Sequence, residues 1–193
     1  MNGFQRRSNK KKQSIIESAQ RLFKRHGWKR TTIAMIAKSA DVSQVTIYNH
    51  FSSKENVLYE VLKSVFEAHM RTLEGIVYDA NRTYDNKIDA LLVLEMEHVD
   101  VLGFDVLRVL NTTDNAKINT LKKWYEANRY MIAFDHLIRE GKKERAIDPT
   151  ISDESFMVYA QWIRRISADV SVRNKSMVKD LLKLFFEGMR GES

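Results

Sequence analysis

The chain has 193 residues, of which 44% are hydrophobic, so it is long enough to bury a substantial core in one or two domains. It contains no cysteine, which excludes disulfides and thiolate metal sites and is compatible with a reducing compartment. The net charge of +7 is concentrated at one end, because residues 1–30 carry ten Lys or Arg and one acid, while the rest carries 22 basic and 24 acidic residues. This asymmetry indicates a nucleic-acid or anionic-membrane partner, with a solvated basic tail as the alternative.

One proline and seven glycines leave little turn chemistry for a many-stranded fold, so we expect an all-α protein of about nine helices. The N-terminus has no apolar run behind its charges, and no stretch reaches the roughly 20 apolar residues that span a membrane. We therefore expect a cytoplasmic protein without a signal peptide or a membrane partner.

The first expected helix covers residues 10–26, where apolar residues recur at helical spacing, and Gly27 ends it. Basic residues at 6–12 form an arm that we expect to be disordered without DNA and to reach phosphates or the minor groove, although a solvated tail is equally compatible. A second, short helix begins after the hydroxyl pair Thr31-Thr32, which can act as its N-cap, and ends at Ala40.

A third helix follows after a connector of about three residues, with Ser43 as its N-cap, and runs to Phe51. Its outward positions carry amide, hydroxyl, imidazole and apolar side chains and no acid: Gln44, Val45, Thr46, Tyr48, Asn49 and His50. Two short helices joined in this way, the second with such a face, form the helix-turn-helix pattern that fits a DNA major groove.

A capping box from Ser52 to Glu55 predicts the start of a long fourth helix that continues to about residue 80. Apolar periodicity and polar turn segments predict further helices around residues 88–96, 104–110, 116–140, 152–170 and 174–189. We expect two domains, a DNA-binding domain at residues 1–53 and a ligand-binding and dimerisation domain at residues 54–193.

Residues 31–57 resemble the TetR family of bacterial transcriptional regulators. The resemblance is carried, in order and spacing, by Thr31-Thr32-Ile33, Ile36-Ala37, Ala40, Val42-Ser43, Thr46-Ile47-Tyr48, His50-Phe51 and Lys54-Glu55. Two positions depart from the family pattern: Asp41 stands where glycine is frequent in the turn, and Val45 stands where a small residue is frequent. Asp tolerates the left-handed backbone region, so we expect the turn to be kept, whereas the bulk of Val45 changes the closest approach to DNA.

The resemblance implies a homodimer that binds a palindromic operator, usually as a repressor, through a DNA-binding head. It also implies a C-terminal region with a pocket for a small effector and a dimer interface made by the last two helices. An alternative is a protein of the same family whose C-terminal region binds a protein partner instead of an inducer. An enzyme is disfavoured, because the chain has no Ser/His/Asp arrangement in a motif context and no phosphate loop, and no cofactor is expected.

Residue chemistry and the resemblance together assign roles at the DNA. Hydroxyl, imidazole and ammonium donors suit phosphate contacts, which set the register, and these donors are Thr32, Tyr48, His50 and Lys54. The candidates for base contacts are Gln44, Val45, Thr46 and Asn49. Ser43 completes the expected DNA-binding set, although a cap explains it better than a base contact. Two alternatives remain open: Tyr48 can pack on the first helix, and His50 can be satisfied by a carbonyl at the helix end.

The C-terminal region is rich in large apolar and aromatic side chains, which form either ordinary core or a pocket for a hydrophobic or aromatic effector. The pocket candidates are Phe66, Met70, Met96, Phe104, Leu107, Trp124, Phe134 and Trp162. The dimer-interface candidates are Tyr159, Ile163, Ile166, Leu181 and Phe185 on the last two helices. Two groups, Glu95 to His98 and His136 with Glu140, have metal-ligand residue types but no recognised ligand spacing, so no metal site is expected.

Overall fold

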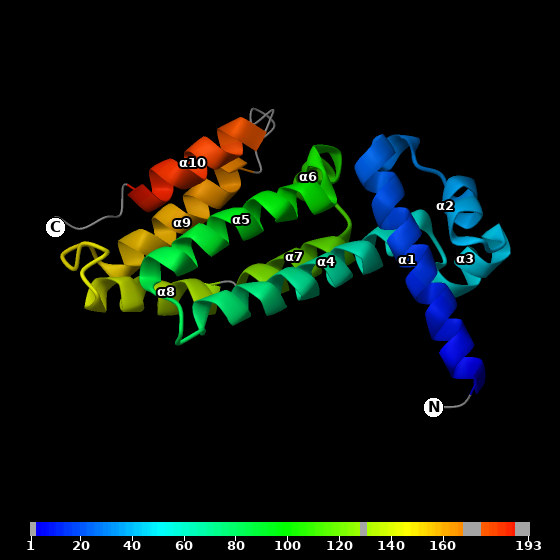
Figure 1. The fold of residues 1–193 in the computed structure, drawn as a ribbon. Coiled ribbons are helices and arrows are strands. Elements are labelled where there is room, and N and C mark those ends of the chain that lie inside the picture. Colours follow the sequence, from blue (N-terminus) through cyan, green and yellow to red (C-terminus); the bar gives the residue numbers. More distant parts are fainter. Residues whose placement is uncertain (1–2, 128–130, 168–174, 188–193) are drawn as a thin grey trace.

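The computed structural model describes residues 3–127, 131–167 and 175–187, which fold into ten α-helices without a β-strand (Figure 1). The helices are α1 (Gly3–Arg30), α2 (Ile33–Ala40), α3 (Gln44–Phe51), α4 (Lys54–Val77), α5 (Tyr84–Leu102), α6 (Phe104–Thr112), α7 (Ala116–Tyr125), α8 (Met131–Lys143), α9 (Asp153–Ser167) and α10 (Lys175–Glu187). The prediction of an all-α fold is confirmed. No helix among the described residues is both long and apolar enough to cross a membrane.

The first three helices form a head at one end of the molecule, and α4 runs from this head into a larger body that contains α5 to α10 (Figure 1). Within the head, α1 packs against α2 and α4, and it also contacts α5 and α6 of the body. The domain boundary that we expect between residues 53 and 54 coincides with the N-cap of α4, and it stays a prediction.

The apolar positions of α1, α2 and α3 form the core of the head. The buried side chains are Ile15, Ile16, Ala19, Phe23, Ile33, Ile36, Ala37, Ala40, Ile47 and Phe51. Since α2 and α3 have eight residues each, shorter than the roughly 12 to 15 residues that an isolated helix needs in water, this burial stabilises them. The core thereby fixes which face of α3 points to solvent.

Helix α1 is longer than predicted, and the arm expected to be disordered is part of it. The helix begins at Gly3, so residues 6–12 are helical, which agrees with a segment that has neither proline nor glycine between residues 4 and 26. Gly27 interrupts the helix as expected, with a φ of 78° and a ψ of 169°, and a final turn follows it.

The predicted N-cap of α4 is wrong by one residue. Ser53, in an extended conformation, accepts a hydrogen bond from the backbone N–H of Asn56 at 3.1 Å, whereas Ser52 has a φ of 63° and closes α3. The N–H of Ser52 donates to the carbonyl of Tyr48 at 2.8 Å. Because an N-cap requires an extended backbone, the residue that closes α3 cannot also open α4.

The helix predicted at residues 116–140 is described in two parts, α7 and α8, and residues 128–130 between them lie outside the described part, so its continuity stays a prediction. The buried positions of α7 are Ile118, Leu121 and Tyr125, and those of α8 include Phe134, Leu137 and Ile138. Continued at 3.6 residues per turn, these two sets would lie on roughly opposite faces of one helix. Residues 126 and 127, which follow α7, form a π-type turn, and such a turn changes the register of the side chains that follow it.

The last two helices agree with prediction within the described residues. Helix α9 was expected at 152–170 and α10 at 174–189, and residues 168–174, 188 and 189 lie outside the described part. A buried ion pair fixes α5 to α8, because the Lys87 ammonium lies 2.5 and 2.8 Å from the two carboxylate oxygens of Glu140. The Tyr84 ring covers the backbone of Gly141 beside this pair, and a Cβ there would lie 2.6 Å from Tyr84 Cζ.

Candidate nucleic-acid interface

Helices α2 and α3 are joined by a tight turn whose hydrogen bonds are made by residues close together in the sequence. Asp41 adopts the left-handed region with a φ of 53° and a ψ of 51°, so the turn is kept without glycine, as expected. The N–H of Val42 donates to the carbonyl of Ala37 at 3.0 Å, and the Ser43 hydroxyl accepts from the N–H of Thr46 at 3.1 Å. These bonds end one helix and begin the next within three residues.

The outer face of α3 presents four exposed side chains: Gln44, Val45, Tyr48 and Asn49. Val45 is 66% exposed and Tyr48 is 49% exposed, whereas Ile47 on the inner face is fully buried. No acid lies on this helix, and its surface combines amide, apolar and phenol groups. The alternative that Tyr48 packs away on α1 is not favoured by this exposure.

Four predicted DNA-binding residues, Thr32, Ser43, Thr46 and His50, take part in helix capping or lie partly inside. The Thr46 hydroxyl is half-buried and lies 2.9 Å from the Ser43 hydroxyl, so both oxygens are engaged at the start of α3. Thr32 caps α2 by accepting from the N–H of Met35 at 3.2 Å, and a hydroxyl that accepts one bond can still donate its own hydrogen. His50 is half-buried, with its ring centroid 6.0 Å from that of Phe51.

Lys54 has contacts that the sequence did not indicate. Its ammonium donates to the carbonyl oxygen of Trp28 at 2.6 Å and lies 4.1 Å from the centroid of the Trp28 ring. Burial lowers the pKa of Lys54 from its usual value, and the neighbouring Glu55 carboxylate partly offsets this. Lys54 therefore links the first turn of α4 to the end of α1, whatever it contacts on DNA.

Basic side chains continue along α1 beyond the core of the head. Arg6, Arg7, Lys10 and Lys11 are exposed, and their spacing places them on one side of the helix; we call them the N-terminal basic cluster. The N-terminal part of α1 projects past α2 and α3 (Figure 1). Lys12 behind this cluster is paired with Glu60 of α4 at 3.1 Å, so it is tied to the protein.

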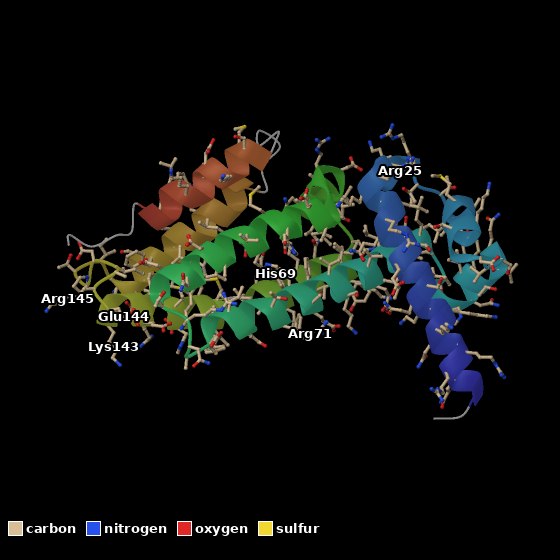
Figure 2. All side chains as sticks on the ribbon, in the orientation of Figure 1. Arg25, His69, Arg71, Lys143, Glu144 and Arg145 are labelled. Carbon is tan, nitrogen blue, oxygen red and sulfur yellow. The ribbon has the colours of Figure 1, made fainter. Side chains whose placement is uncertain are left out.

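A second group of exposed basic residues lies at the other end of α1: Lys24, Arg25, Lys29 and Arg30, which we call the C-terminal basic cluster. Figure 2 places Arg25 at the end of α1 that is remote from its N-terminus, beside α6. The local excess of positive charge is therefore divided between two ends of one long helix.

The residues expected to line a pocket do not form one uniform set. Phe66, Met70 and Phe134 are buried, and Met96 and Leu107 are half-buried, whereas the side chain of Phe104 lies outside the described residues. Trp124 and Trp162 are 38% and 56% exposed, so neither belongs to the described core. We therefore assign Trp162 to the outer surface of α9 and not to the interior of the body.

A polar and aromatic cluster in the body joins α4, α5 and α7, and sequence spacing alone could not reveal it. His69 is almost fully buried between α4 and α5 (Figure 2), with Nδ1 2.6 Å from the Tyr125 hydroxyl and Nε2 3.3 Å from a carboxylate oxygen of Glu95. The Phe66 ring stacks on Tyr125 at 4.3 Å, and the His98 ring lies 4.3 Å from that of His69. Among the described residues, no group of three or more potential ligands is arranged to hold a metal ion.

The predicted dimer-interface residues are only partly described. Tyr159 is 36% exposed on α9, and its ring lies 6.2 Å from that of Trp162. Leu181 on α10 is half-buried, and the side chains of Ile163, Ile166 and Phe185 lie outside the described residues. Val158, Met177 and Leu184 are further exposed apolar side chains on these two helices.

Comparisons with known proteins agree with the geometry of the head. Residues 15–61 match the family model described as "Bacterial regulatory proteins, tetR family". The chain is 34% identical over 76 residues to the HTH-type transcriptional regulator HbdR of Aromatoleum sp. (strain CIB), which covers 37% of this chain and 33% of HbdR. It is 30% identical over 141 residues to the "Probable HTH-type transcriptional regulator YttP" of Bacillus subtilis (strain 168), which covers 69% of this chain and 66% of YttP. The aligned part of the chain thus spans one third to about two thirds of these relatives.

Solved structures show the same fold over nearly the whole chain. The fatty acid degradation regulator FadR from Bacillus halodurans superimposes with a TM-score of 0.70 at 20% identity, over 94% of this chain and 97% of that chain. A transcriptional regulator of the TetR/AcrR family from Thermobifida fusca superimposes with a TM-score of 0.69 at 20% identity, over 93% of this chain and 98% of that chain. The named relatives are transcriptional regulators and not enzymes, which agrees with the class expected from the sequence.

Proposed function

The chain belongs to the TetR family of bacterial regulatory proteins, and from that premise we propose that it is a cytoplasmic repressor that binds a palindromic operator as a homodimer and responds to a small effector. The observation that carries the proposal is the exposed, acid-free face of α3, held outward by the buried Ile47 and Phe51. A helix of this size and polarity fits the major groove.

The residues of the head divide into those that position the protein and those that read bases. Gln44 and Asn49 are exposed amides, which can pair bidentately with adenine, and Val45 can contact a thymine methyl group. Tyr48, His50 and the capping hydroxyl of Thr32 suit phosphate oxygens, which carry no sequence information directly. The N-terminal basic cluster extends this phosphate-binding surface along the flanking duplex.

Substitutions on α3 should separate these two roles. We expect Gln44→Ala to lower the discrimination between bases at one operator position by about 1–3 kcal/mol of binding free energy. We expect His50→Ala to weaken binding to all duplexes about equally. The measurement is a mobility-shift series on a duplex selected from a random library by the unmodified chain, with each position varied. Uniform weakening by Gln44→Ala would remove it from the base-reading set.

The two basic clusters of α1 provide a matched comparison for phosphate contacts. Replacing the N-terminal basic cluster with Gln should reduce the slope of log affinity against log salt by about 0.9 for each phosphate that the variant no longer neutralises. The same replacement in the C-terminal basic cluster removes equal charge but should leave the slope nearly unchanged. Equal slopes for both variants would show that α1 contributes only long-range attraction.

The exposed apolar side chains of α9 and α10 support dimerisation through these helices. Tyr159 and Trp162 form a stacked aromatic pair on the surface of α9, and aromatic residues are enriched at interfaces. A second copy would cover this surface and would bring two heads onto one palindromic site.

The α9 surface can be tested by a charge substitution. We expect Trp162→Glu to give monomers in sedimentation velocity and to lose operator binding, because a buried unpaired carboxylate opposes association. Ile132→Glu is the control, since Ile132 on α8 is 59% exposed in the same single chain. A dimeric Trp162→Glu protein that still binds DNA would contradict the assignment.

The cluster around His69 supports an effector site in the body. Phe66, His98 and Tyr125 offer aromatic faces, while Glu95 adds a partly exposed carboxylate beside them. Such a combination suits a hydrophobic or aromatic effector that also carries a polar group.

A thermal-shift screen with hydrophobic cations and acyl compounds tests this site. A compound that binds only the folded chain should raise Tm in a concentration-dependent way, and it should release the chain from its selected duplex. Phe66→Ala should weaken both effects for the same compound. A compound that raises Tm equally in both proteins would locate the effector elsewhere, and a screen without any shift would favour a protein partner.

A further inference from the structure

The main chain of Trp28 is held at its N–H and at its carbonyl by two groups that are far apart from each other in the sequence. Its N–H donates to a carboxylate oxygen of Asp105 in the first turn of α6, at 2.6 Å. Its carbonyl accepts from the Lys54 ammonium in the first turn of α4, also at 2.6 Å. Both bonds have a charged partner, so they are stronger than ordinary amide hydrogen bonds.

The glycine before Trp28 makes room for the Asp105 carboxylate. A Cβ on Gly27 would lie 3.0 Å from Asp105 Cγ and 2.5 Å from its Oδ2, and the second distance is shorter than real Cβ contacts. The positive φ of Gly27 also turns the next N–H out of the helix ladder. On the opposite side of the contact, Gly103 lies against the backbone of Lys24, with its Cβ position 3.7 Å from the Lys24 Cα.

The Lys54 side of this arrangement leads directly to the DNA-reading helix. Lys54 is the first residue of α4, and the two residues before it, Ser52 and Ser53, close α3 and open α4. The Trp28 carbonyl and ring therefore hold the corner between α3 and α4 in place. The Phe23 ring also lies against the Trp28 indole, with ring centroids 5.4 Å apart, so the indole is in contact with the head core.

We propose that Asp105 is a positioning residue for DNA recognition, which holds Trp28 and, through Lys54, the corner between α3 and α4. The inference rests on the proposed function, because it assigns a role to a residue of the body in DNA binding by the head. Asp105 does not belong to the proposed DNA-binding surface, and it acts through its bond to the Trp28 N–H and its contact with Gly27.

A charge effect and a positioning effect of Asp105 predict opposite changes in DNA affinity when this acid is removed. If Asp105 acted only by its negative charge, Asp105→Ala would reduce repulsion from DNA and tighten binding slightly. If Asp105 holds the Trp28 peptide, Asp105→Ala should weaken binding, because the α3–α4 corner is then held less firmly. Asp114 is the matched control, since it is an exposed acid just beyond the other end of α6.

The first measurement is the affinity of the full-length chain for the duplex it selects from a random library. We expect Asp105→Ala to weaken binding by about tenfold, within the usual range for coupling between sites, and Asp114→Ala to leave it equal or slightly tighter. Asp105→Asn keeps the shape and one acceptor oxygen, so it should fall between the two. If Asp105→Ala proves unstable, the Asp105→Asn chain takes its place in this comparison.

The second measurement does not involve DNA. With Trp124 and Trp162 replaced by Phe, Trp28 is the remaining tryptophan. Its fluorescence emission then reports on the contacts of Trp28 with Asp105 and Lys54, which we call the Trp28 clamp. Asp105→Ala should shift that emission, while Asp114→Ala should not. In a double-mutant cycle, Gly27→Ala should destabilise the Asp105→Ala chain less than the unmodified chain, because the cycle cancels the backbone strain at Gly27 and leaves the contact with Asp105.

These results separate the inference from the proposed function. An unmodified chain that selects no duplex would overturn the proposed function, and with it the role of Asp105 in DNA recognition, even if the emission and the cycle showed that the Trp28 clamp exists. An unmodified chain that binds its duplex, together with an Asp105→Ala chain that binds as tightly as the Asp114→Ala chain, would overturn the positioning role alone. Additive destabilisation in the cycle would remove its structural basis.

Discussion

The DNA-facing surface depends on burial of two helices that are too short to persist alone. Helices α2 and α3 have eight residues each, and their inner positions, including Ile36 and Ile47, are fully buried against α1 and α4. That burial does more than stabilise them, because it fixes the rotation of α3 about its own axis. Because Ile47 and Phe51 are buried on one face of α3, the amide, phenol and valine side chains on the other face point to solvent.

The turns around α3 are built from residues that tolerate an unusual backbone or supply a hydroxyl acceptor. Asp41 and Ser52 both have positive φ, and they end α2 and α3 respectively. Ser43 and Ser53 are extended and cap the helices that follow. The recognition helix is thus bounded at both ends by short-range bonds, and its orientation relative to the body is left to longer contacts such as those of Trp28.

The head and the body are joined by packing as well as by chain continuity. Helix α4 passes through both, while α1 also contacts α5 and α6. One polar contact in this joint is the half-buried bond from the Trp28 N–H to Asp105, and an unpaired N–H there would be costly.

The sequence by itself determined the features that arise from neighbours along the chain. Helical periodicity, hydroxyl caps, the tolerance of Asp41 for the left-handed region and the absence of acids on α3 were all readable within short windows, and the family followed from the order of residues 31–57. The tertiary structure alone decided the rest. It showed that Ser53 and not Ser52 caps α4, that Trp162 lies on the surface, and that Trp28 is held by Asp105 and Lys54. These features depend on which surfaces meet between residues up to 77 positions apart, and local propensity contains no information about that pairing.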